Sequence, residues 1–141
     1  MDRLGPISVG MTAAQVGKAV GPHVAEDFSP NNECFHLRRT GNLSGVSFMM
    51  IGGEVARIEV DTLSVVSWSG VRIGSTEEQI KKIYGARVKV EPHKYLEGNG
   101  HYLTLRLQDG RFGRRFETEN RRVVRFYAGL WKHLRYVEGC A

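Results

Sequence analysis

Three side chains in the stretch PHKYLEGNGHY have the spacing of metal ligands. His93, Glu97 and His101 follow one another at intervals of four residues, which would bring all three to one face of a helix. The segment 98–100, Gly-Asn-Gly, separates the last two and argues against any helix there. We therefore expect a polar turn at this place, with no metal site and no cofactor.

Two tyrosines flank the same loop. Tyr95 and Tyr102 each combine a large apolar ring with a polar hydroxyl, a combination that suits the edge of a binding surface. We interpret them as aromatic residues at strand ends. Together with His93 and His101 they form the first group of candidate binding residues.

Nucleophilic catalysis has no support in the pattern. A Cys–His pair would need Cys34 beside one of the five histidines, and nothing in the linear sequence selects one. The chain contains no Gly-x-Ser-x-Gly elbow, no phosphate loop and no dinucleotide-binding fingerprint. We expect a protein without enzymatic activity.

The stretch RFGRRFETENRRVVRFY is the basic part of the chain. Arginines beside aromatic residues are typical of platforms for single-stranded nucleic acid. In a strand, however, alternation would send Arg125 and Phe126 to opposite faces, and an arginine face would suit an acidic protein equally well. Another protein with an acidic surface therefore fits this face, and so does simple solvation of the arginines. A cytosolic nucleic-acid binder using the arginines of residues 111–125 is the alternative. The candidate arginines are Arg115, Arg122 and Arg125.

Size and composition predict one compact unit over residues 1–141. The chain is 41% hydrophobic, which is enough for one shared core in a protein of this length. Its net charge of +5 favours acidic partners only in a general way. No stretch approaches the roughly 20 apolar residues of a membrane-spanning helix, and the first residues lack the apolar region of a signal peptide. A cytoplasmic protein and an exported protein without its signal segment both fit this pattern.

The elements that must position these residues occur twice. The segments ISVGMTAAQVGKAVG and VRIGSTEEQIKKIYG align with a constant offset of 64 residues, which pairs Gly10 with Gly74 and Thr12 with Thr76. A weaker similarity at an offset of 68 pairs Val55 with Val123. The sequence therefore predicts two repeats, at about residues 4–66 and 68–141.

Each copy begins with a capping signal. A Thr followed three residues later by Gln predicts a capping box, so Thr12 with Gln15 and Thr76 with Gln79 should each start a helix. Gly21 and Gly85 stand where a left-handed residue would end these helices. Helices of about two and a half turns need a sheet to pack on.

Three strands should follow each helix. In the first copy they are CFHLRR, GVSFMM and EVARIEVD, with a hairpin at Gly52 and Gly53. In the second copy they are HYLTLRLQ, RFGRRFETE and RRVVRFYAG, with turns at residues 109–110 and 119–120. The tail LWKHLRYVEGC allows a final strand or a helical turn. The predicted fold is α+β, with two helix-plus-antiparallel-meander repeats sharing one sheet or forming two abutting sheets, and the short helices on one face.

The Gly-Met-Thr-x-x-Gln-Val entry of the first copy, its counterpart Gly-Ser-Thr-x-x-Gln-Ile in the second, and the meanders that follow them resemble the beta-lactamase inhibitory protein family. A single copy is also similar to the small lipoprotein of the outer-membrane barrel-assembly machinery. The resemblance covers about a quarter of the chain and implies export to the bacterial cell envelope, periplasmic or outer-membrane associated. It further implies protein binding through the exposed sheet face and its loops, in the manner of an inhibitor. No target-binding residue can be carried over, because the matched residues cap helices and pack.

Cys34 and Cys140 are the only cysteines. Neither belongs to a Cys-x-x-Cys pair, which disfavours a zinc cluster. In an exported protein they would form one disulfide between the early part of the chain and its C-terminus. In a cytosolic protein they would remain unlinked thiols. The inhibitors differ here, because they carry a disulfide within each repeat.

Overall fold

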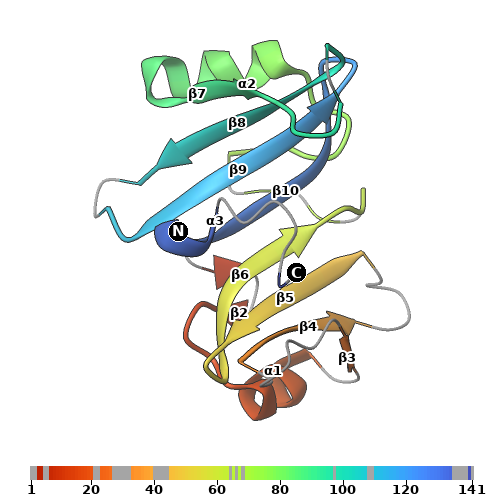
Figure 1. Cartoon of the computed structure of the whole chain (residues 1–141), viewed down its shortest axis with the longest axis vertical. Helices are drawn as coiled ribbons and strands as arrows, with labels where there is room; N and C mark the ends of the chain where they lie inside the picture. Colours follow the sequence, from red (N-terminus) through yellow and green to blue (C-terminus); the bar gives the residue numbers. More distant parts are fainter. Residues whose placement is uncertain are drawn as a thin grey trace.

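The two repeats join edge to edge in one antiparallel sheet. The computed structural model describes residues 3–4, 7–20, 23–26, 33–39, 45–63, 65, 67, 69–96, 98–107, 110–134 and 140. Eight strands within these residues form the sheet in the order β3-β4-β5-β6-β10-β9-β8-β7 (Figure 1). A separate two-stranded ribbon lies near the start of the chain. The α+β class and the shared sheet are confirmed.

The first repeat contains a helix and a four-stranded meander. Its elements are α1 (Ala13–Val20), β3 (His23–Glu26), β4 (Cys34–Arg39), β5 (Val46–Ile51) and β6 (Glu54–Val60), and the small ribbon before them is β1 (Arg3–Leu4) and β2 (Ile7–Ser8). The second repeat contains α2 (Glu77–Tyr84), the 3-10 turn η2 (Gly85–Arg87), β7 (Lys89–Pro92), β8 (Gly100–Arg106), β9 (Phe112–Glu119), β10 (Arg122–Leu130) and the helical turn α3 (Trp131–Leu134).

The prediction of three strands per repeat was wrong, because each meander has four. The missed strands, β3 and β7, are the two edges of the sheet and have only four residues each. Short edge strands with charged residues and a proline give little alternation to detect. The second hairpin turns at Asn120 and Arg121, one residue later than predicted, and residues 131–134 of the tail form a helical turn. Gly21 and Asp109 lie outside the described residues.

Equivalent hydrogen bonds show that the repeats share one architecture. The amide of Gly10 donates to the carbonyl of Val55, and that of Gly74 donates to Val123, at 2.8 Å in both cases. Both predicted capping boxes are formed. Thr12 Oγ1 and Thr76 Oγ1 each accept from the amide three residues on at 3.2 Å, and the glutamine side chains accept from the threonine amides. The internal duplication is therefore structural as well as sequential.

The capping threonines allow a direct test of the helix starts. Thr12→Ala and Thr76→Ala should each lower the free energy of unfolding by about 1 kcal/mol, because a helical amide loses its acceptor. Urea unfolding measures this loss. Thr12→Ser and Thr76→Ser, which keep the hydroxyl, serve as matched controls and should stay close to the parent. Alanine variants as stable as the serine variants would contradict the capping role.

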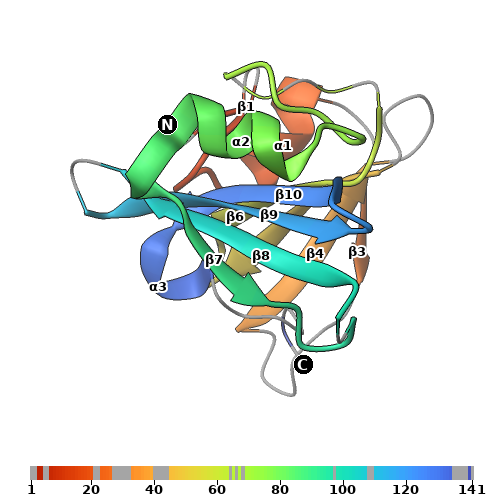
Figure 2. The same cartoon turned by 90° about the horizontal axis from the view of Figure 1, so that it is seen from above.

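The two longer helices cover one face of the sheet. Figure 2 shows α1 and α2 on the same side of the sheet and α3 on the other side, and Figure 1 shows α1 and α2 at opposite ends of the molecule. Beneath each long helix lies an apolar cluster. One contains Val16, Phe48 and Ile58, and the other contains Ile80, Phe116 and Phe126. This core fixes which residues of every strand face the helices, and alternation sends their neighbours to the opposite face.

A disulfide joins strand β4 to Cys140, the next-to-last residue of the chain. Cys34, the first residue of β4, is bonded to Cys140, with the Cα atoms 5.5 Å apart. The bond spans 106 residues and confirms the exported-protein alternative for these cysteines over unlinked thiols. Cys140 is thereby fastened to the first repeat.

Candidate functional site

The sheet face that points away from α1 and α2 carries a row of polar side chains. In this row Ser47 pairs with Glu59, which pairs with Tyr127, and Tyr127 pairs with Arg115. Arg115 in turn pairs with Thr104. The row crosses the junction between the repeats, and Ser47, Arg115 and Thr104 are almost completely buried. We call this surface the polar face.

Arg57 anchors the half of the polar face that belongs to the first repeat. Its side chain is 2% exposed, donates to Glu59 through Nε at 2.8 Å and also through Nη2, and lies 4.4 Å from the centre of the Tyr127 ring. Nη1 donates to the carbonyls of His133 and Leu134, both at 3.3 Å, which holds α3 against the sheet. This part of the polar face is therefore occupied by the chain itself.

Glu59 is kept ionised by its neighbours. Burial alone would raise its pKa, but the hydrogen bond from His36, the charge of Arg57 and the charge of His36 together lower the pKa to about 2. Ser47 Oγ donates to the same carboxylate at 3.1 Å. Such a paired and buried charge organises the fold, and its geometry leaves no free group for a ligand.

In the second repeat, five of the predicted binding residues gather around one carboxylate, that of Glu117. His93 Nε2 lies 2.7 Å from Glu117 Oε1, and Arg125 Nη1 lies 3.9 Å from Glu117 Oε2. The Tyr95 and Tyr102 rings lie next to the His93 ring, and the Arg115 guanidinium lies over the Tyr102 ring. We call the whole set the Glu117 cluster; its members are His93, Tyr95, Tyr102, Arg115, Glu117 and Arg125.

Ring stacking makes the Glu117 cluster rigid. The His93 and Tyr102 rings stack at a centroid distance of 4.5 Å, and the Arg115 guanidinium lies 4.2 Å from the centre of the Tyr102 ring on the buried side of the cluster. Burial raises the pKa of the Tyr102 phenol, whose oxygen accepts from the amide of Lys94. The Tyr95 amide donates to His93 Nδ1 at 3.1 Å, so the loop itself is fixed by the histidine.

Two members of the cluster are presented to solvent. Tyr95 is 58% exposed, and the Arg125 side chain is 49% exposed. They are carried on buried partners, His93 and Glu117, which limits the conformational freedom that binding would have to remove. Tyrosine and arginine are the residue types that contribute most often to protein interfaces.

The arginines of residues 111–125 do not share one surface. Arg114 donates to the Tyr84 hydroxyl at 3.0 Å on the helix side, while Arg115 is 3% exposed on the polar face and donates to Thr104. Arg122 donates to the carbonyl of Gly74 at 2.9 Å and lines a pocket at the start of α2. Phe126 belongs to the core and Arg125 to the other face, as alternation predicts.

The two histidines of the spacing H-x7-H are separated by the sheet. His93 pairs with Glu117 on the polar face, whereas His101 Nδ1 lies 2.8 Å from Glu77 of α2 on the helix face. Glu97 lies outside the described residues. Among the residues described, no group of three histidine, cysteine or carboxylate side chains is placed to hold a metal ion.

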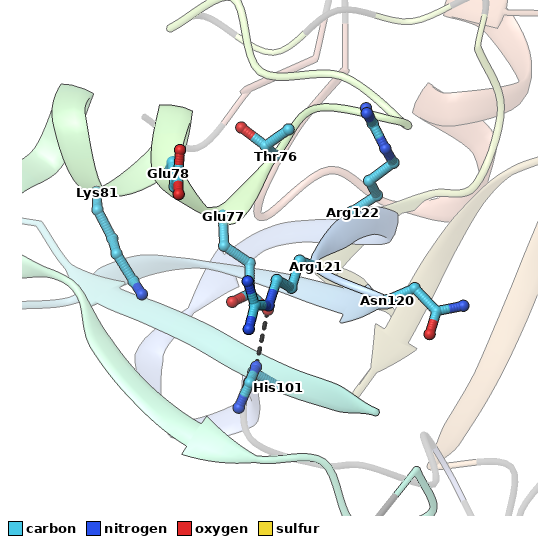
Figure 3. Close-up of a pocket in the computed structure, with 8 residues that line it drawn as sticks. All are labelled: Thr76, Glu77, Glu78, Lys81, His101, Asn120, Arg121 and Arg122. Atoms are coloured by element: carbon cyan, nitrogen blue, oxygen red, sulfur yellow. Dashed lines mark hydrogen bonds and ion pairs between the residues drawn. The ribbon is translucent and has the colours of Figure 1, made fainter. Parts of the chain in front are cut away.

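His101 and Arg122 line a separate pocket at the start of α2, which we call the α2 pocket (Figure 3). Sequence reasoning placed these two residues with the other candidates, and the structure separates them. It missed Glu117 and Glu77, because a single glutamate among many charged residues gives no signal of burial. Alternation from the core residue Phe116 is the one signal that would have placed Glu117 on the same face of the sheet as Arg125.

Solved structures with the same fold come from exported bacterial proteins. No family model and no curated protein matches the chain. An extracellular protein containing an SCP domain from Bacillus anthracis is 12% identical, with a TM-score of 0.60 over 88% of this chain and 44% of that one. A cysteine-rich secretory protein from Staphylococcus aureus is 11% identical, with a TM-score of 0.56 over 88% of this chain and 45% of that one. The chain thus spans less than half the length of either protein, and the likeness shows the fold alone.

These findings agree with an exported protein. The disulfide belongs to the oxidising compartments outside the cytosol, and the two similar structures are of an extracellular and a secretory protein. Within the described residues, every helix is too short or too polar to cross a bilayer.

Proposed function

We propose that this chain is a non-enzymatic, protein-binding module of the bacterial cell envelope, periplasmic or outer-membrane associated. Its partner would present an acidic surface to the Glu117 cluster and the loop that carries Tyr95. The observation that carries this proposal is the gathering of five candidate residues in one cluster, with Tyr95 and Arg125 exposed on a buried, hydrogen-bonded base. An exposed tyrosine and an exposed arginine that are both held by buried partners are suited to docking a protein.

The resemblance to the beta-lactamase inhibitory protein family supports the same proposal. In that family the duplicated unit binds a protein, and inhibition of an enzyme is the form of binding that it implies here. A nucleic-acid partner would need several arginines on one accessible surface. The burial of Arg115 and the hydrogen bond of Arg122 to Gly74 make that surface smaller than the sequence suggests.

Photo-crosslinking from position 95 tests the proposal. A photoreactive phenylalanine analogue in place of Tyr95, in protein expressed in its native cell, should yield a discrete adduct with a second protein. Ile83 on α2 is the matched control, since it is 45% exposed and lies on the helix side of the sheet. The same analogue at position 83 should give no such adduct.

Charge reversal tests the acidic partner, and nuclease treatment separates the protein and nucleic-acid hypotheses. Arg125→Glu should reduce the position-95 adduct at least tenfold, because the acidic partner would then face a negative side chain. An adduct that disappears on nuclease treatment would favour nucleic acid instead. Equal adducts at positions 95 and 83, or none at position 95, would contradict the proposed docking surface.

A further inference from the structure

The α2 pocket is polar in the second repeat only, although both repeats build the same corner. It is a cavity of about 430 Å³ between the start of α2, β8 and the β9–β10 hairpin. His101 pairs with Thr118 across the strands at this place, and both contact Glu77, the residue after the capping Thr76. In the first repeat, Phe35 stands in the place of His101 and pairs with Met50, which stands in the place of Thr118. Ala13, the residue after Thr12, stands in the place of Glu77.

The first repeat shows that the fold can close this corner with apolar side chains. Met50 is completely buried, and Phe35 and Ala13 pack against the same apolar cluster. A buried ion pair is seldom more stabilising than well-packed apolar residues of similar volume. The polar trio of the second repeat is therefore not a requirement of the architecture.

The trio holds a histidine in a fixed orientation at the cavity. Thr118 Oγ1 donates to Glu77 Oε2 at 2.5 Å, and His101 Nδ1 lies 2.8 Å from the same oxygen. The Glu77 side chain is 7% exposed and that of His101 is 40% exposed. Figure 3 shows the second ring nitrogen of His101 turned away from Glu77, so the contact with Glu77 leaves it available.

The hairpin adds two arginines where the first repeat has none. Asn120 and Arg121 occupy the turn positions that Gly52 and Gly53 occupy in the first repeat, and all four have positive φ. Glycine adopts this conformation at little cost, whereas Arg121, at φ 66°, does so under strain. The next residue, Arg122, replaces the glutamate of the first repeat at position 54; each pairs with its capping threonine in an isolated bridge.

Basic side chains outnumber acidic ones in the lining of this cavity. Lys81, Arg121 and Arg122 line it together with Glu77 and Glu78, and the charge of Glu77 is engaged by Thr118 and His101. In the first repeat the position of Lys81 is held by glycine, at residue 17. The second repeat carries a strained arginine and further charged residues that the first repeat folds without. This difference indicates that these residues serve a ligand and not the fold.

We propose that the α2 pocket binds an oxyanion, either a phosphate or a carboxylate group, through Lys81, Arg121 and His101. Glu77 acts as a positioning residue, because it fixes the imidazole and holds its Nδ1 side. A cavity of this volume accepts a small anionic molecule. The site lies on the helix side of the sheet and is independent of the Glu117 cluster.

Calorimetric titration of the full oxidised chain tests this proposal, with inorganic phosphate and citrate as separate probes at constant ionic strength. One of them should bind with 1:1 stoichiometry, and the identity of the probe assigns the site to phosphate or to carboxylate. Arg121→Gly, which restores the first repeat's residue, should weaken binding at least tenfold. The triple variant Glu77→Ala, His101→Phe, Thr118→Met, which copies the apolar trio, should do the same. Lys18→Ala, which removes an exposed positive charge from α1 of the first repeat, should bind like the parent.

Folding measurements on the same variants complete the test. Arg121→Gly and the triple variant should have urea midpoints no lower than the parent, because the first repeat folds with those residues. Lower midpoints would mean that the polar residues serve the fold and would overturn the proposal. The proposal would also be overturned if neither phosphate nor citrate bound up to about 10 mM, or if Arg121→Gly bound the probe as tightly as the parent. Crosslinking from position 95 does not depend on these residues, so the two proposals fail separately.

Discussion

Replacing both Cys34 and Cys140 by serine is expected to lower the free energy of unfolding by about 4 to 5 kcal/mol. The bond closes a loop of 106 residues, so nearly the whole unfolded chain regains conformational freedom when it is removed. For a chain of this length the melting temperature should fall by roughly 10 to 15 °C. Urea unfolding of the oxidised parent and the double variant measures the difference.

The reduced parent is the control for this prediction. It contains no cross-link but keeps both native side chains, so its midpoint should coincide with that of the double serine variant. A loss of less than about 1 kcal/mol would mean that the unlinked unfolded chain is already compact, and the loop-entropy argument would fail.

Arg57→Met is expected to cost about 3 to 5 kcal/mol at neutral pH. The variant leaves the Glu59 carboxylate buried without its cation and removes the donor to the His133 and Leu134 carbonyls. Arg125→Met is a matched control, because Arg125 occupies the equivalent position in the second repeat but is half exposed and 3.9 Å from Glu117. Its cost should be between about 0 and 1 kcal/mol.

Acid should reduce the difference in stability between the parent and Arg57→Met. The folded pKa of Glu59, about 2, lies below the ordinary value of 4.5, so its interactions stabilise the fold fully above pH 4.5. That contribution is lost as the pH falls from 4.5 towards 2 and the carboxylate takes up a proton. Urea midpoints of both proteins across this range measure the convergence. A difference that stays constant from pH 7 to pH 2.5 would show that the Arg57–Glu59 charge pair is not its cause.

Local signals predicted the parts of the fold that depend on neighbouring residues. Thr12 and Gln15 lie three residues apart, so the capping box could be read from the sequence, and the Gly52–Gly53 hairpin likewise. The pairing of β6 with β10 brings Ile58 opposite Ala128, a contact between residues that no local pattern connects. The edge strands β3 and β7 were missed because their four residues carry no alternation.

The candidate site was predicted in its members but not in its geometry. Tyr95, Arg125 and His93 were selected by residue type, and the structure brings them together around Glu117. The pairing of Arg125 with Glu117 depends on a register shift between Val123 and Arg125, which cannot be seen in the sequence. His101 was grouped with His93 because linear spacing does not show that a sheet separates them.

The β6–β10 junction has a consequence for how such a protein could arise. A single repeat would leave β6 as an unpaired edge in the middle of what is now the sheet, and its backbone groups would need a partner strand. A second identical copy, related by a two-fold axis, would supply that strand, so an unduplicated ancestor would complete the sheet as a symmetric dimer. In such a dimer every substitution appears twice. Fusion of the copies into one gene frees each half to diverge alone, which is how Gly53 and Arg121 can now occupy the same turn of the same fold.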